Sequence, residues 1–349
     1  MGRIYRYVGV VHVHTAFSDG GGMIEEVIAA ARNTSLDFLV ITDHNDLRAK
    51  EYEGWHRDTL VLAGEEVTRP GGNHMLALGI NELISPDLTP QEGIEAAKAQ
   101  GGCVFLAHPF YRGSALIDDP PLLWRDWEVE GFDGIEVWNL TADLYQILGE
   151  RPPERPPRDV LALATPNQAA LCKWDELLVR GHVVGLGGLD AHAERIPRWN
   201  GITILPYEKA FRALRIHLLM REPLDGHFCR GRDLILGAIC SGNFLVVFDH
   251  LYGGEDVLVY VVQGEELFLP GEPIPPGKTS VLQVDLPVTA GIRLIHRAKE
   301  VLRREGRNVS VRLDLPGPYR LEIYLKNKPW VLVNPFYIGD YGSAGVTNV

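Results

Sequence analysis

The sequence is poor in several features that mark particular classes of protein. It has only four cysteines in 349 residues, at Cys103, Cys172, Cys229 and Cys240, and no two of them form a CxxC pair. This spacing predicts four free thiols in the core of a cytoplasmic protein. No apolar run approaches the roughly 18 residues of a membrane helix, so we expect no membrane span. The apolar stretch near the start is short and is interrupted by His12, which argues against a secretory signal.

Positive charge is also scarce. The chain has 34 Lys and Arg against 46 Asp and Glu, a formal net charge of −12 at pH 7. This balance argues against broad electrostatic binding to nucleic acid or anionic lipid, although nucleic acid is not excluded as a substrate. With 46% hydrophobic and 23% charged residues, the composition is typical of a soluble globular protein. Its length suggests about two domains.

The first two thirds of the chain alternate short apolar runs with amphipathic stretches, which is typical of a parallel α/β architecture. The predicted strands are Val8–Val13, Phe38–Thr42, Leu60–Ala63, Leu76–Gly79, Val104–Ala107, Gly134–Trp138 and Val183–Gly187. The predicted helices are Met23–Arg32, Pro90–Ala99 and Lys173–Val179. The segment RPPERPPR at 151–158 cannot form regular structure, because proline fixes φ and removes backbone donors, and we expect an extended surface insertion.

After about Asn243 the sequence becomes rich in β-branched and aromatic residues between Gly/Pro turns, which predicts a small antiparallel β-sandwich. We therefore expect two domains, 1–243 and 244–349. One segment, Ile292–Arg304, fits either a helix or two strands, and periodicity does not decide between them.

Histidines and acids cluster just past the ends of the predicted strands. They are His12, His14, Asp19, Asp43, His44, Glu66, His74, His108, Glu136, Asp190 and His192. In a closed parallel barrel the carboxyl ends of the strands meet at one rim, so these side chains can share one pocket. Residues two apart on a strand point the same way, so His12 and His14 can bind one ion. Together the residues predict a metal site.

Several of these residues have a second interpretation. Asp19 fits the N-cap of the following helix as well as a metal ligand, and His74 fits an ordinary loop histidine. Glu65 and Glu66 point to opposite faces of a strand, so only one of them can face the pocket. Three residues at the end of the predicted strand Gly134–Trp138 fit either a strand end or a pocket lining, and they are Glu136, Trp138 and Asn139. The histidines without such company are expected to be structural or exposed, and they are His56, His182, His217, His227, His250 and His296.

The ordered motifs HVHTAFSDG, ITDHN, GEEVT, NHMLALG, AHPF and GLDAH, within residues 12–192, resemble those of the PHP family, the polymerase and histidinol phosphatase metal-dependent hydrolases. The resemblance implies a distorted (β/α)7 barrel with two or three metal ions on its C-terminal rim. The tail NKPWVLVNPFYI resembles the carbaryl-hydrolase-like (CehA/McbA) branch of that family. GGLDAH replaces the more usual Gly-Ser-Asp version and keeps both ligands.

Carried over motif by motif, the resemblance implies three sets of ligands. One ion takes His12, His14, Glu66 and Asp190. A second ion shares Glu66 and takes His74 and His108, and a third takes Asp19, His44 and His192. The choice of Glu66 over Glu65 rests on this resemblance. Imidazole and carboxylate ligands suit Zn, Mn or Fe(II) without selecting among them.

These expectations predict a phosphoesterase. Three divalent ions carry about +6 of charge against the three carboxylates Asp19, Glu66 and Asp190, and the excess favours a small anionic phosphate ester. A metal-bridging water is expected to attack phosphorus, and Asp43 is expected to orient an imidazole. The side chains predicted to bind the substrate are Arg112, Asn139, Arg195 and Arg198. The alternatives are hydrolysis of a carbamate, ester or amide at the same site, or a non-catalytic metal-stabilised binding module. The sequence is also compatible with a homo-oligomer.

Overall fold

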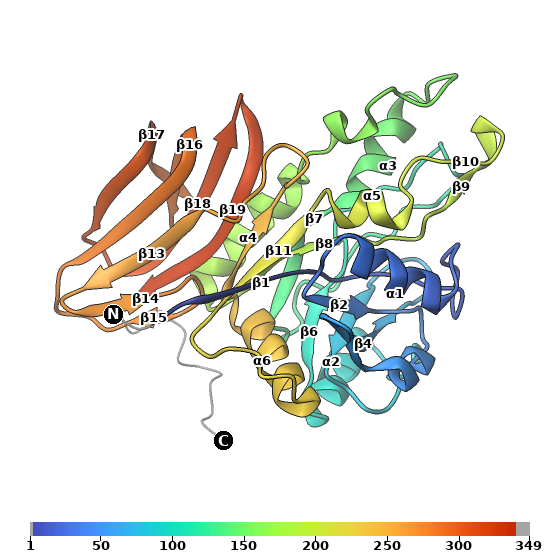
Figure 1. Cartoon of the computed structure of the whole chain (residues 1–349), viewed down its shortest axis with the longest axis horizontal. Helices are drawn as coiled ribbons and strands as arrows, with labels where there is room; N and C mark the ends of the chain where they lie inside the picture. Colours follow the sequence, from blue (N-terminus) through green and yellow to red (C-terminus); the bar gives the residue numbers. More distant parts are fainter. Residues whose placement is uncertain (1–2, 340–349) are drawn as a thin grey trace.

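The computed structural model describes residues 3–339, so the outer ends of the two predicted domains, residues 1–2 and 340–349, lie outside it. The protein is a mixed α/β fold in which 17 strands of the described chain form one connected sheet, with a separate two-stranded pair. An α/β part and a β-rich part lie side by side, with the β-rich part at the left in Figure 1. The predicted domain boundary at 243 and 244 remains a proposal.

All seven predicted strands of the α/β part overlap observed strands. These are β1 (Tyr5–Val10), β2 (Phe38–Ile41), β4 (Thr59–Val67), β5 (Met75–Leu78), β6 (Cys103–Leu106), β7 (Gly134–Asn139) and β8 (Val184–Gly188). Strands β1, β2 and β4 are parallel neighbours, as are β6, β7 and β8. The purely parallel arrangement is wrong at β5, which pairs antiparallel with both β4 and β6. Only residues 68–74 join β4 to β5, too few for the crossover that a parallel pair needs.

The three predicted helices overlap α1 (Ile24–Asn33), α2 (Pro90–Ala99) and α4 (Gln168–Arg180). The remaining helical segments are η1 (Arg48–Tyr52), α3 (Leu140–Glu150), η2 (Val160–Leu163), η3 (Pro197–Trp199), α5 (Tyr207–Phe211) and α6 (Phe228–Ser241). Helix α3 was missed, although Asn139 caps it by accepting a hydrogen bond from the Ala142 amide at 2.9 Å. The proline-rich segment 151–158 contains no helix or strand, as predicted.

The β-rich part is mostly antiparallel. Its strands are β13 (Leu258–Gln263), β14 (Glu266–Phe268), β15 (Pro273–Ile274), β16 (Ser280–His296), β17 (Lys299–Leu313), β18 (Gly317–Leu325) and β19 (Lys328–Ile338). The short β15 is the exception, because it pairs parallel with β19. The segment Ile292–Arg304 forms parts of two strands, β16 and β17, joined by a tight turn with positive φ at Arg297 and Ala298.

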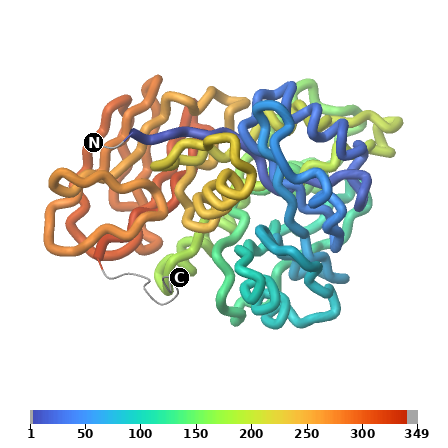
Figure 2. Tube along the Cα trace, turned by 60° about the horizontal axis from the view of Figure 1, so that its bottom comes forward, coloured from blue at the N-terminus to red at the C-terminus, as the bar shows by residue number. Residues whose placement is uncertain are grey.

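Two further strands connect the parts. Strand β11 (Arg215–Met220) pairs antiparallel with β1, and β12 (Phe244–Val247) pairs with both β11 and β19. Alternate residues of β12 face different cores, because successive side chains of a strand point to opposite faces. Phe244 and Val246 lie in the core of the α/β part, and Leu245 and Val247 lie in the β-rich core. Figure 2 shows β1 running from the β-rich part towards the α/β part.

The short strands complete the fold. Strand β3 (Gly54–His56) pairs with β4, and β9 (Arg195–Ile196) pairs with β10 (Ile202–Thr203) in the separate two-stranded pair. No helix in residues 3–339 is long and apolar enough to cross a membrane.

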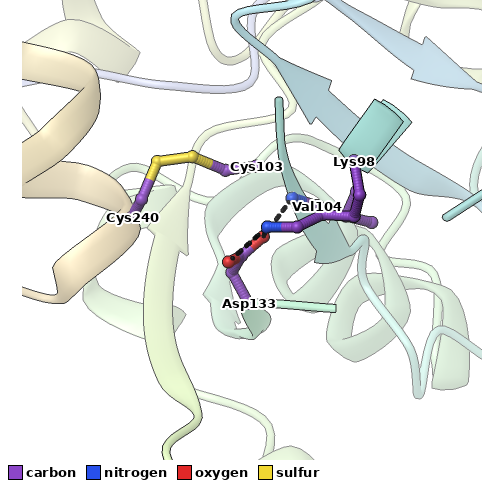
Figure 3. Close-up of a disulfide and its surroundings, with 5 residues drawn as sticks. All are labelled: Lys98, Cys103, Val104, Asp133 and Cys240. Atoms are coloured by element: carbon purple, nitrogen blue, oxygen red, sulfur yellow. Dashed lines mark hydrogen bonds and ion pairs between the residues drawn. A yellow bond between two sulfur atoms is a disulfide. The ribbon is translucent and has the colours of Figure 1, made fainter. Parts of the chain in front are cut away.

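The prediction of four free core thiols is wrong. Cys103 at the start of β6 forms a disulfide with Cys240 of α6, with their Cα atoms 5.9 Å apart (Figure 3). Cys172 and Cys229 are free but exposed. The bonded pair is 137 residues apart in sequence, and no local pattern reveals such a contact. Because stable disulfides are uncommon in the cytosol of most organisms, the cysteines no longer support the cytoplasmic location, which stays a prediction.

The start of β6 beside the disulfide is also fixed by polar contacts. Asp133 accepts hydrogen bonds from the Val104 amide at 2.7 Å and from Lys98 of α2 at 2.9 Å (Figure 3). These contacts join α2, β6 and the segment before β7 at the amino-terminal end of β6, whereas His108 follows its carboxyl end.

Candidate metal centre

His12 and His14 lie beyond the end of β1 and not on the strand itself. Strand β1 ends at Val10, and His12 has a left-handed backbone with a φ of 67°. Val13 instead forms an isolated parallel bridge with Ala191, supported by a hydrogen bond of 3.0 Å from the His14 amide to the Ala191 carbonyl. The predicted strand geometry is therefore wrong for this pair, yet both imidazoles face the same carboxylates.

The first cluster brings together His12, His14, Glu66 and Asp190. His12 Nε2 lies 3.1 Å from Glu66 Oε2 and 3.3 Å from Asp190 Oδ1. His14 Nε2 lies 3.2 Å from each of these two oxygens. All four residues are buried, and their ligand atoms come from three separate segments of the chain.

These separations have the size expected around one metal ion. With metal–ligand distances of about 2.0–2.2 Å, neighbouring ligand atoms of an octahedral or tetrahedral site lie about 3.0–3.5 Å apart. The fully buried His14 makes no hydrogen bond from either ring nitrogen to any described residue, although its Nε2 lies close to two carboxylates. Buried polar atoms are rarely left without partners, so His14 fits the role of a metal ligand.

The second cluster uses the other oxygen of Glu66. Glu66 Oε1 lies 3.0 Å from His74 Nδ1 and 3.0 Å from His108 Nε2. All three residues are buried. A carboxylate with one oxygen in each of two clusters fits a bridge between two ions.

The third cluster contains Asp19, His44 and His192, with His14 at its inner side. Asp19 Oδ1 lies 3.2 Å from His192 Nε2, and Asp19 Oδ2 lies 3.5 Å from His44 Nε2. The Asp19 side chain is 61% exposed, so this cluster faces solvent while the other two are enclosed. Met23 occupies the N-cap of α1, so the interpretation of Asp19 as the cap is wrong.

Four of the six imidazoles have one ring nitrogen within hydrogen-bond distance of a backbone carbonyl, a hydroxyl or the Glu136 carboxylate, and His44 Nδ1 also lies 3.0 Å from Glu66 Oε2. Histidines that bind metals usually donate their second N–H in this way, which fixes the tautomer and orients the ring. The acceptors are Glu136 Oε1 for His12 Nδ1 at 2.7 Å, Thr68 Oγ1 for His44 Nδ1 at 2.6 Å, the Arg69 carbonyl for His74 Nε2 at 3.2 Å and the Asp190 carbonyl for His192 Nδ1 at 2.8 Å. In each case the other nitrogen is left facing a cluster.

The pKa values of the metal-free site reflect the close approach of imidazoles and carboxylates in the clusters. Burial disfavours the charged form of His44, but the carboxylates of Glu66 and Asp19 together raise its pKa to about 11. His192 is affected in the same way by Asp19 and Asp190, and its pKa is raised to about 9. Burial alone would raise the pKa of Glu66, but the surrounding imidazoles hold it well below its ordinary value. A bound cation would replace protons that these carboxylates otherwise hold on the imidazoles.

Glu136 and Asn139 belong to none of the three clusters, but they form hydrogen bonds that hold cluster residues in place. Besides its bond with His12, Glu136 accepts hydrogen bonds through Oε2 from the His108 amide at 2.7 Å and from Asn139 Nδ2 at 2.9 Å. Asn139 is buried, and its amide oxygen caps α3. These contacts favour a positioning role for Asn139 over the predicted contact with substrate. Trp138 is also buried and packs against Phe248.

Replacing Glu136 should weaken metal binding without removing a ligand. In Glu136→Gln the amide NH2 can donate a hydrogen bond to His12 Nδ1. This favours the tautomer with its proton on Nε2, so that Nε2 is no longer free to bind a metal. We expect metal affinity to fall about 10- to 100-fold, the usual cost of losing such a partner. Competition of the protein with a chromogenic chelator for Zn²⁺ measures this, with the exposed Glu150→Gln as the control. Unchanged affinity would contradict the positioning role.

Asp43 does not contact an imidazole as predicted. Its carboxylate accepts hydrogen bonds from the Thr15 amide at 2.7 Å, the Thr15 hydroxyl at 2.8 Å and the Ser18 hydroxyl at 2.6 Å. The prediction of an imidazole partner is therefore wrong, because the loop after His14 folds back onto the end of β2. Asp43 instead fixes the loop that carries His14 and Asp19.

A cavity of about 740 Å³ opens beside the three clusters. Its lining includes Asp19, His44, His74, His108, Asp190 and His192 from the clusters, together with Thr68, Tyr111, Asp119, Thr141, Tyr145 and Glu194. The predicted substrate-binding arginines do not line it. Arg112, Arg195 and Arg198 are all exposed, and Arg112 lies near Glu150 in a neighbouring depression. Their closeness in sequence to His108 and His192 does not bring their side chains to the cavity.

Glu65 faces away from the clusters, on the opposite side of β4 from Glu66. Its Oε2 accepts a hydrogen bond from the Ile84 amide at 2.8 Å, while its buried Oε1 has no hydrogen-bond partner in residues 3–339. Burial raises the pKa of Glu65 to about 7. The structure thus assigns Glu66 to the clusters, in agreement with the family resemblance.

This burial predicts a pH-dependent effect on stability. The folded-state pKa of Glu65 lies above its ordinary value of 4.5, so Glu65 destabilises the fold as the pH rises through about 4.5–7. Glu65→Gln should therefore raise the free energy of unfolding at pH 8 by up to about 3 kcal/mol and change it little at pH 4.5. Urea denaturation of both proteins at the two pH values measures the difference. An equal effect at both would contradict the assignment.

The six histidines expected to be structural or exposed belong to none of the three clusters. His217 is the most buried of them, and its Nε2 lies 2.9 Å from Asp249 near the interface of the two cores.

No family model matches the chain. It is 29% identical over 144 residues to an uncharacterized protein of Methanocaldococcus jannaschii, an alignment that covers 37% of this chain and 80% of that protein.

Two solved structures are similar in part. One is a two-domain protein of Bacteroides vulgatus described as containing a predicted PHP-like metal-dependent phosphoesterase, with a TM-score of 0.45, 16% identity and 95% coverage of both chains. The other, from Bifidobacterium adolescentis, is provisionally described as a metal-dependent phosphoesterase, with a TM-score of 0.32, 18% identity and coverage of 53% of this chain and 87% of that one. At these TM-scores neither similarity supports a statement about activity.

Proposed function

We propose that the protein is a metal-dependent phosphoesterase of the PHP type that hydrolyses a small phosphate mono- or diester. The observation that carries this proposal is that four of the six imidazoles have one ring nitrogen hydrogen-bonded to another group while the other nitrogen faces Glu66, Asp190 or Asp19. The carbaryl-hydrolase-like branch, the barrel topology and the β-sandwich remain parts of the proposal.

The residues present fit two or three divalent ions such as Zn, Mn or Fe(II). When bound, such ions polarise phosphoryl oxygens and lower the pKa of water, which supplies the nucleophile for hydrolysis. In the reaction water adds to phosphorus, the ester P–O bond breaks, and the alcohol and phosphate products take up the protons of the water.

The charge of the enclosed part of the site favours an anion. Two divalent ions carry about +4, while the first two clusters contain two carboxylates, Glu66 and Asp190. The loaded site is then about +2 at the floor of the cavity. A third ion with Asp19 would add about one further positive charge. This excess attracts a phosphate group more strongly than a neutral carbamate or amide.

The chain's own residues organise this chemistry. Glu136 orients His12 and the His108 backbone, and Asp43 fixes the loop between His14 and Asp19. Tyr207 also holds this loop in place, because its hydroxyl donates a hydrogen bond to the His14 carbonyl at 2.8 Å. These contacts position the ligands before any substrate binds.

Parallel assays test the proposal against its nearest alternative. The metal-loaded protein should hydrolyse 4-nitrophenyl phosphate or bis(4-nitrophenyl) phosphate faster than 4-nitrophenyl N-methylcarbamate. The double variant His12→Ala/His14→Ala should lose this activity, whereas the exposed His227→Ala should keep it.

One observation favours the alternative, hydrolysis of a carbamate, ester or amide. None of the three arginines predicted to bind a phosphate lines the cavity. Faster turnover of the carbamate would therefore replace the phosphoesterase proposal. Absence of turnover on a broad ester panel with metals fully loaded would favour the non-catalytic module.

A further inference from the structure

The cavity wall beyond the metal clusters is acidic. Asp119 and Glu194 line the cavity and are partly buried, and the exposed Asp118 stands at its edge. They lie on two loops that are separate in sequence, one after His108 and one after His192. Both loops are therefore positioned by the clusters and face the same space.

Backbone and side-chain contacts hold the Asp119 loop in place. Ser114 and Asp119 form an isolated antiparallel bridge, with amide-to-carbonyl distances of 2.9 and 3.0 Å in the two directions. The Arg112 amide donates to Gln146 of α3 at 2.7 Å, which fastens the loop to the helix. The backbone position of Asp119 is thus fixed by the fold.

No positively charged side chain balances this wall. The cavity lining contains no lysine, and its one arginine, Arg69, is turned away. The Arg69 guanidinium donates to the Leu88 carbonyl at 3.1 Å and to the Asn73 carbonyl at 3.0 Å, on the side of α2. Asp119 and Glu194 therefore have no cationic partner in the lining apart from the cluster imidazoles.

An unpartnered hydroxyl on α3 independently indicates a ligand in this space. Tyr145 lines the cavity and is only 2% exposed, yet its hydroxyl makes no hydrogen bond with any residue in 3–339. Besides burial, the charges of Glu194 and Asp190 raise the pKa of Tyr145. A hydroxyl at a cavity wall without a protein partner is expected to bind water or a ligand.

We propose that Asp119, Glu194 and Tyr145 select phosphate esters whose alcohol part carries a protonated amine and reject esters with a second anionic group. This inference rests on the proposed phosphoesterase function. The metal clusters bind the phosphate, and the acidic wall binds the ammonium of the leaving group. Tyr145 donates to an oxygen of the bound ester.

Three esters of matched length test the selection, namely 3-aminopropyl phosphate, propyl phosphate and 2-carboxyethyl phosphate. For the metal-loaded protein we expect kcat/KM to fall about tenfold at each step in that order, because opposite charges attract and like charges repel in a partly buried site. Asp119→Asn combined with Glu194→Gln should reduce the total range from about 100-fold to about threefold. Glu150→Gln, outside the cavity, should retain the full range.

Tyr145→Phe should lower kcat/KM for all three esters by a similar factor of about three to ten, the loss expected for one hydrogen bond. The metal content of each variant is also measured, because it distinguishes a loss of selection among the three esters from a loss of bound metal ions. Equal kcat/KM for the three esters in the unmodified protein would overturn the inference and leave the phosphoesterase proposal intact. Absence of phosphate release from all of them, with metals loaded, would overturn the proposed function itself.

Discussion

Glu66→Gln is expected to abolish activity, with a fall in kcat of about 10³-fold or more. Glu66 Oε2 lies beside His12 and His14 while Oε1 lies beside His74 and His108. One substitution therefore removes a charged ligand from both enclosed clusters. An amide keeps the size of the side chain but offers a single neutral oxygen, so it cannot bridge two cations.

Glu65→Gln is a matched control for this variant. It changes the neighbouring residue in the same way, on the same strand, but on the opposite face of β4. Metal content measured by mass spectrometry should fall by one to two ions per chain in Glu66→Gln and remain unchanged in Glu65→Gln. Wild-type metal content and turnover in Glu66→Gln would show that Glu66 binds no metal.

Removal of the metals is expected to lower the melting temperature by 10 °C or more, on the order of the effect of losing two tightly bound ions. An ion present at 1,000 times its dissociation constant stabilises the folded state by about 4 kcal/mol, so two ions contribute about 8 kcal/mol. The metal-free protein also places buried carboxylates and imidazoles against one another without a cation, which adds a cost of desolvation.

Thermal denaturation before and after dialysis against a chelator measures this effect. Readdition of Zn²⁺ or Mn²⁺ should restore the melting temperature and the activity together. The His12→Ala/His14→Ala variant should show a much smaller shift, since it lacks two ligands of the first cluster. A melting temperature that does not change when the metals leave would contradict the assignment of these residues as a structural and catalytic centre.

The sequence predicts which histidines and acids come together, because each lies in a short motif near a strand end. His12, His14, Glu66 and Asp190 come together in the structure, and so do Glu66, His74 and His108. The local geometry was less predictable. The left-handed backbone of His12 and Asp190 depends on how their two loops pair with each other, and a pattern of alternating residues does not contain that information.

Long-range contacts account for the other errors. The disulfide between Cys103 and Cys240 depends on the packing of α6 beside β6, and the direction of β5 depends on its partner strands. The predicted role of the arginines relied on their closeness in sequence to ligands, but the side chain of Arg112 points towards Glu150. Residues such as Tyr145 and Thr141 lie outside the ligand motifs, and only the folded chain places them beside the site.

The most direct test of the account is a crystal structure of the metal-loaded protein with anomalous diffraction recorded at the absorption edge of the bound metal. The account predicts one anomalous peak about 2.0–2.2 Å from His12 Nε2, His14 Nε2, Glu66 Oε2 and Asp190 Oδ1, and a second beside Glu66 Oε1, His74 Nδ1 and His108 Nε2. Absence of both peaks from a protein shown to be metal-saturated, or peaks located elsewhere in the fold, would contradict it.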